Sequence, residues 1–103
     1  MLLQIHLVVE TTNQDGRHVR LDGFTLVVNA HGGLLEMGLK VPKGHRLLLT
    51  NTTLGVQELC HVVAVRSSED GYYAVAFEFD NPAPHFWPIA FPPVDWQLVQ
   101  QED

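Results

Sequence analysis

The sequence predicts an all-β protein, a small six-stranded antiparallel β-barrel followed by a C-terminal tail rich in proline and aromatic residues. Apolar and polar residues alternate with a period of two along several stretches, as they do in half-buried strands. Turn-forming pairs such as Asp15-Gly16 and Asp70-Gly71 separate these stretches. Helical apolar stripes are absent from the pattern. Short strands at this spacing favour a closed barrel, because closure removes exposed sheet edges.

Six strands are predicted in chain order, near residues 2–10, 18–30, 33–38, 45–51, 56–67 and 72–80. The first is the apolar N-terminal run, and the second places alternate apolar residues from Phe24 to Ala30 on one face. The third and fourth lie between turns at Gly32-Gly33, Pro42-Lys43-Gly44 and Leu54-Gly55. The fifth and sixth alternate in the same manner, and the alternation from Tyr72 to Phe79 is the clearest.

The tail differs in kind from the strands. Five of the six prolines fall in residues 82–103, interleaved with four aromatic residues: Pro82, Pro84, Pro88, Pro92 and Pro93, with Phe86, Trp87, Phe91 and Trp96. This proline density excludes a central strand, and so much aromatic area is costly to leave in water. Two interpretations remain open. The tail is either a lid whose rings plug the barrel or pack on its outside, or a patch that binds a partner.

Length and charge limit the classes of function. The 103 residues leave room for one domain, predicted over residues 1–103, and a hydrophobic content of 46% favours a folded chain. The net charge of −6 argues against nucleic acid or an anionic membrane surface as partner. The apolar start lacks the features of a signal peptide, and every apolar run is shorter than a membrane helix requires. We therefore expect a cytoplasmic protein without membrane insertion.

Residue types that carry catalysis are present without the arrangement that catalysis needs. Cys60 is the single cysteine and lies within an apolar strand, where burial raises the pKa of a thiol and makes it inert. The six histidines are 12 to 24 residues apart, unlike the ligands of local metal motifs. Nucleophile-elbow and phosphate-loop patterns are missing from the sequence. We therefore predict that the protein is not an enzyme and holds no metal and no cofactor.

The most informative segment is the polar corner between the second and third predicted strands, residues 29–33. Asn29 and His31 occupy alternate positions, so both side chains point to the same side of the sheet. Gly32 and Gly33 permit a positive φ and the close approach of a ligand or of another backbone. An ordinary tight corner between strands is the alternative. Residues 1–46 also hold five of the six basic side chains, so an anion could be met locally on this acidic chain.

The order of these motifs resembles the PilZ domain from about residue 18 to residue 96. The resemblance rests on the Asn-x-His-Gly-Gly corner, the Pro-x-Gly turn, the hairpin from Leu47 to Val65 and the strand Tyr73-x-Val75-x-Phe77-x-Phe79. The tail motifs at 82–87 and 91–96 resemble those of a PilZ-like subgroup of bacterial proteins. The resemblance implies a six-stranded barrel that binds cyclic di-GMP, through an Arg-x-x-x-Arg motif and an Asp/Asn-x-Ser-x-x-Gly corner.

On this chain the resemblance implies a nucleotide site formed by Arg17, Arg20, Asn29, His31, Gly32 and Gly33. Asn29 matches the first corner position, whereas His31 stands in place of serine. Arg17 and Arg20 are spaced Arg-x-x-Arg. These differences favour a non-enzymatic bacterial signalling or regulatory module with a degenerate motif, which acts by contact with an unidentified protein partner. The alternative is a receptor for cyclic di-GMP or a related nucleotide, in which the arginine forks hold phosphate in a rebuilt site.

Overall fold

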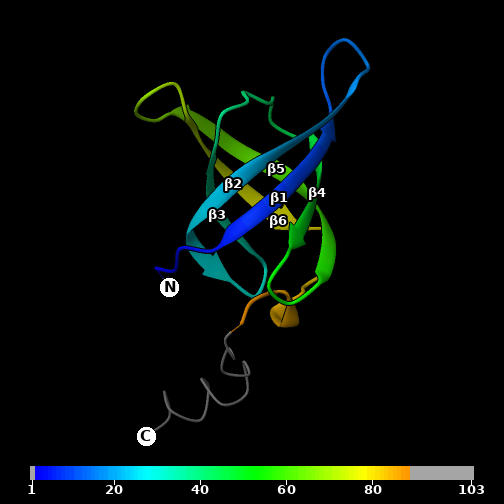
Figure 1. The fold of residues 1–103 in the computed structure, drawn as a ribbon, viewed down its shortest axis with the longest axis vertical. Helices are drawn as coiled ribbons and strands as arrows, with labels where there is room; N and C mark the ends of the chain where they lie inside the picture. The colour runs from blue at the N-terminus through cyan, green and yellow to red at the C-terminus, as the bar shows by residue number, and fades with distance from the viewer. Residues whose placement is uncertain (1, 89–103) are drawn as a thin grey trace, which may run out of the picture.

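A computed structural model describes residues 2–88, which form a closed antiparallel barrel (Figure 1). The elements are β1 (His6–Thr12), β2 (His18–Asn29), β3 (Gly32–Met37), β4 (Arg46–Asn51), β5 (Val56–Ser67), β6 (Tyr73–Phe79) and the 3-10 helix η1 (Pro84–Phe86). Around the barrel the strands follow the order β1-β2-β3-β6-β5-β4, and β4 pairs with β1 to close it. The all-β class and the six-stranded barrel predicted from the sequence are confirmed.

The first strand begins later than the apolar N-terminal run predicts, at His6 and not near residue 2. Before this strand, the side chain of Thr25 on β2 forms hydrogen bonds to the N-terminal backbone, where a regular strand would have a continuous ladder. Its hydroxyl donates to the carbonyl of Leu3 at 2.6 Å and accepts from the Ile5 amide at 2.7 Å. The register of β2 against β3 also shifts between Thr25 and Val27. A bulge of this kind bends a strand and interrupts its ladder, so residues 2–5 continue beside β2 without joining the sheet regularly.

Alternate residues of all six strands fill the barrel interior, as the period of two requires. The residues buried there are mostly aliphatic: Leu7, Val9, Val28, Leu35, Met37, Val41, Leu47, Leu49, Cys60, Val62 and Val75. Phe77 and Phe79 of β6 pack with aromatic side chains of the segment that follows the barrel, and Figure 1 shows the ribbon of that segment at the lower end. The core therefore ends in a layer of rings contributed by β6 and η1.

The segment after β6 caps this lower end (Figure 1). Phe86 and Trp87 are each only 2% exposed, and their rings meet edge to face at a centroid distance of 4.8 Å. Phe86 also packs on Phe79, at 5.3 Å. The buried side-chain amide of Asn51 donates to the Phe86 carbonyl at 2.8 Å, which fixes the cap to the end of β4. The lid interpretation of the tail is confirmed for residues 82–88, while Phe91 and Trp96 lie outside the described residues.

Helices contribute little to residues 2–88, where η1 has three residues. Within this part of the chain, no helix has the length and apolar character needed to cross a membrane.

Candidate functional site

The polar corner at residues 29–31 joins β2 to β3 at the lower end of the barrel. Asn29 pairs with Gly32, so Ala30 and His31 form a two-residue turn. The Asn29 side chain is used locally, because its Oδ1 accepts from the His31 amide at 2.8 Å. Both side chains are exposed, and His31 lies in the turn just after β2 ends at Asn29.

The backbone carbonyls of this corner are bound by the chain itself. The indole Nε1 of Trp87 donates to the Asn29 carbonyl at 2.8 Å, and the Ala83 amide donates to the Ala30 carbonyl at 3.0 Å. The Phe79 amide donates to the His31 carbonyl at 2.7 Å. Two of these three acceptors therefore hold the lid in place and the third binds the end of β6, so the corner has a structural role that its sequence alone did not reveal.

Gly32 and Gly33 serve the approach of neighbouring strands. A Cβ at Gly32 would lie 2.1 Å from the Phe77 carbonyl oxygen, and one at Gly33 would lie 2.4 Å from the Val27 carbonyl oxygen. Neither glycine adopts a positive φ, so the corner does not use that conformational freedom. The expectation of a close approach by another backbone is confirmed.

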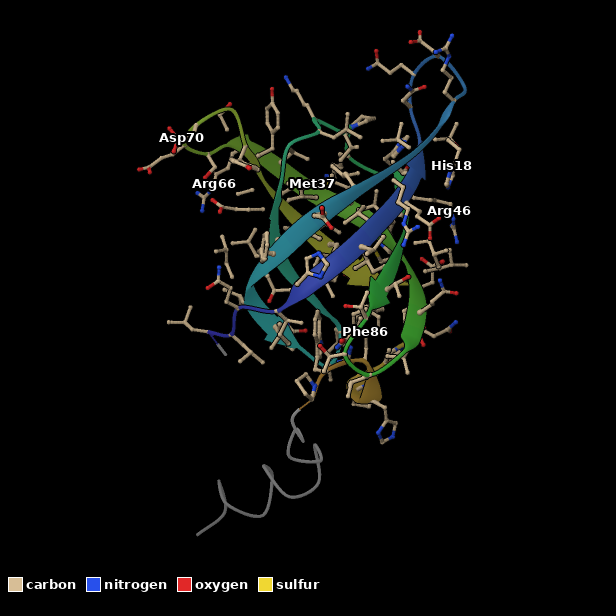
Figure 2. All side chains as sticks on the ribbon, in the orientation of Figure 1. His18, Met37, Arg46, Arg66, Asp70 and Phe86 are labelled. Carbon is tan, nitrogen blue, oxygen red and sulfur yellow. The ribbon has the colours of Figure 1, made fainter. Side chains whose placement is uncertain are left out.

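The two arginines of the predicted nucleotide site lie far from the corner. Arg17 closes the β1–β2 turn, where its amide donates to Asn13 Oδ1 at 2.9 Å, and Arg20 stands opposite Glu10 on β1. Arg20 and Asn29 are nine residues apart on one strand, which at about 3.3 Å per residue separates them by about 30 Å. Figure 2 places His18, beside Arg17, toward the upper end and Phe86 at the lower end. The fold thus groups Asn29, His31, Gly32 and Gly33 together and leaves Arg17 and Arg20 at the opposite end.

The cationic loops meet each other at the upper end. The β1–β2 turn and the loop between β3 and β4 enclose a hollow of about 510 Å³, whose walls include Asn13, Asp15, Lys40 and His45. His45 is held in place because its Nε2 lies 2.8 Å from the Thr12 carbonyl oxygen. The two loops that carry basic residues in the sequence therefore lie side by side, but among the walls of this hollow Lys40 stands with the acidic Asp15, and the corner is not part of it.

A second surface was not anticipated from the sequence. We call it the apolar face, and it consists of outward side chains on β2, β3, β6 and β5: Val27, Leu34, Val63, Ala64, Ala74 and Ala76. Two adjoining hollows of about 400 and 230 Å³ lie on it and share Leu34 and Ala76 as walls. The larger hollow reaches the corner, whose residues also line it: Asn29, His31, Gly32 and Gly33. The register places Val27, Leu34, Ala76 and Ala64 in one row across the four strands. The signal available in the sequence was the outward set of the sixth strand, whose members Ala74 and Ala76 are apolar.

A polar cluster lies on the outside of β4 and β5. Arg46 pairs with the carboxylate of Asp80, whose other oxygen lies 3.3 Å from His61 Nδ1. Beneath it, burial raises the pKa of the Cys60 thiol to about 12, and the nearby Asp80 charge acts in the same direction. The raised thiol pKa expected from the sequence is confirmed. Among residues 2–88, no three metal-binding side chains converge on a common point.

No family model, curated protein or solved structure matches the chain. The resemblance to the PilZ domain therefore stays a prediction from the sequence motifs.

Proposed function

We propose that this protein is a non-enzymatic regulatory module of the PilZ type, which acts in the cytoplasm by binding another protein through the apolar face. The observation that carries the proposal is the apolar face itself, where exposed and half-buried apolar side chains of four adjacent strands, together with the buried Ala74, line two connected hollows. Contiguous apolar surface on a small protein is typical of interaction sites. A closed barrel offers no free strand edge, so a partner has to bind a face or a loop.

The position of the arginines supports protein binding over nucleotide binding at the corner. A dianionic nucleotide needs local cations on a chain whose net charge is −6. Arg20 lies about 30 Å from Asn29 along β2 and Arg17 precedes that strand, and the corner carbonyls already accept hydrogen bonds from residues 79–87. We therefore expect cyclic di-GMP to bind with a dissociation constant above about 10 μM, which corresponds to a binding free energy weaker than about −7 kcal/mol.

Site-specific cross-linking tests the proposed use of the face. A photoreactive residue at Ala76, in the middle of the apolar face, should capture a protein in living cells. The same residue at Gln57, which is exposed elsewhere on β5, is the matched control and should capture none. Equal capture at both positions, or capture at neither, contradicts the proposal.

A second candidate function is a receptor for cyclic di-GMP or a related anionic nucleotide. The observation that favours it is the upper hollow of about 510 Å³, where Lys40 and His45 line the wall beside the turn that carries Arg17. Calorimetric titration with cyclic di-GMP separates the two candidates. Sub-micromolar binding that Lys40→Ala or Arg17→Ala abolishes would establish the receptor. If Asn29→Ala alone abolished it, the nucleotide would instead be bound at the corner.

A further inference from the structure

We propose that the protein bound to the apolar face is a second copy of this chain, packed face to face about a two-fold axis that runs along β6. This inference rests on the proposed use of the apolar face and names its occupant. It is carried by the positions of the charged side chains on either side of β6. Under that rotation, the acidic side chain of one copy meets the basic side chain of the other.

The strand register fixes these positions. In the upper row, Ala74 of β6 stands between Glu36 of β3 and Arg66 of β5. In the middle row, Ala76 stands between Leu34 and Ala64. Glu36 and Arg66 therefore lie on opposite sides of Ala74, two strand spacings or about 10 Å from each other.

A two-fold axis along β6 exchanges the β3 side of one copy with the β5 side of the other. Arg66 then opposes Glu36 of the second copy, and the same pair forms again in reverse, as an isologous interface requires. In the middle row the longer Leu34 opposes the short Ala64, so the two surfaces interlock. Twisted sheets pack face to face with their strands nearly aligned, which suits this arrangement.

Both charged groups are available for such a pair. Arg66 is exposed and forms no ion pair within residues 2–88, and Figure 2 shows it on the outside of the barrel below the turn at Asp70. Glu36 accepts one hydrogen bond through Oε2, from the Ser68 hydroxyl at 2.5 Å. That bond orients the carboxylate and leaves Oε1 for an arginine.

The axis also makes one unfavourable contact, which sharpens the test. Glu78 lies on β6 in the lower row, between Gly32 and His61. A residue on the axis opposes itself, so the dimer brings two like charges together. Replacing Glu78 with glutamine removes this repulsion and should therefore strengthen the dimer. If Glu78 instead made a favourable contact with the partner, the same change would weaken the dimer.

Sedimentation velocity on the full chain, from about 1 to 200 μM, measures the association. We expect a dimer whose dissociation constant increases about tenfold or more in Arg66→Glu and in Glu36→Arg, because each change reverses two ion pairs. An equimolar mixture of these two variants should form heterodimers with near wild-type affinity, since both opposing pairs are then complementary again. Glu78→Gln should decrease the dissociation constant. Arg20→Glu, an exposed change on β2 away from the face, is the matched control and should leave it unchanged.

Three results would overturn the inference. These are a chain that stays monomeric to about 200 μM, a dimer insensitive to both charge reversals, and a mixture that fails to recover association. Circular dichroism melts of every variant show whether a lost dimer reflects a lost fold.

Failure of this inference is distinguishable from failure of the proposed function. A monomer whose Ala76 position cross-links to a different protein refutes only the second copy, whereas a monomer that cross-links to nothing refutes both.

Discussion

The aromatic cap should contribute a large part of the stability of the barrel, and Phe86→Ala tests this. The ring is almost fully buried, packs edge to face on Phe79 and Trp87, and leaves a cavity at the lower end when truncated. Truncations of this kind cost about 3–5 kcal/mol. An unfolding entropy of about 2.1 cal/mol/K per residue gives about 0.22 kcal/mol/K for a chain of this length. The expected decrease in melting temperature is therefore about 14–23 °C.

Calorimetry or a circular dichroism melt measures the change, and urea unfolding gives the free energy independently. His85→Ala is the matched control, because His85 lies in the same short helix with an exposed side chain. We expect its effect to be within about 0.5 kcal/mol of zero. If Phe86→Ala lost less than about 1 kcal/mol, the cap would be bound too weakly to act as the end of the core.

Three further changes probe the lid, the corner and the buried thiol. Asn51→Ala removes the donor to the Phe86 carbonyl, so urea unfolding should show a loss of about 1–3 kcal/mol. Gly32→Ala should destabilise the fold severely in a thermal melt because its Cβ would meet backbone, whereas Gly38→Ala, where the nearest atom is 4.0 Å away, should not. Because burial raises the Cys60 pKa from 9.0 to about 12, the unfolded chain releases this proton first. The free energy of unfolding should therefore decrease from pH 9 toward 12, and Cys60→Ala should flatten that dependence in urea titrations.

The strands were predictable because their pattern is local. Alternation placed β2, β4, β5 and β6 within about one residue of their observed limits. The start of β1 was not predictable, since it depends on the Thr25 hydroxyl and on a bulge formed only when β2 meets β3. Apolar character alone does not distinguish a residue that is hydrogen-bonded within a regular β-ladder from one that lies beside a strand without regular pairing.

The candidate site was less predictable for a related reason. The sequence placed Asn29 and His31 on one side of a corner, but the hydrogen bonds from residues 79–87 come from far along the chain. It also grouped the arginines with the corner because they are near in sequence, although the extended strand β2 separates Arg20 from Asn29 by nine residues. The apolar face lies across four strands, so it became visible only once their register was known.

The position of β6 in the barrel has a consequence for the order of folding. This strand joins β3 to β5, and the segment after it binds the carbonyls of the β2–β3 turn. During synthesis, β3 and β5 therefore keep open edges until residues 73–79 have been made. Closure then depends on contacts between distant parts of the chain, which slows folding into the range of milliseconds to seconds. A ribosome-bound chain that ends before β6 is the form of this protein most exposed to edge-to-edge aggregation and most in need of a chaperone.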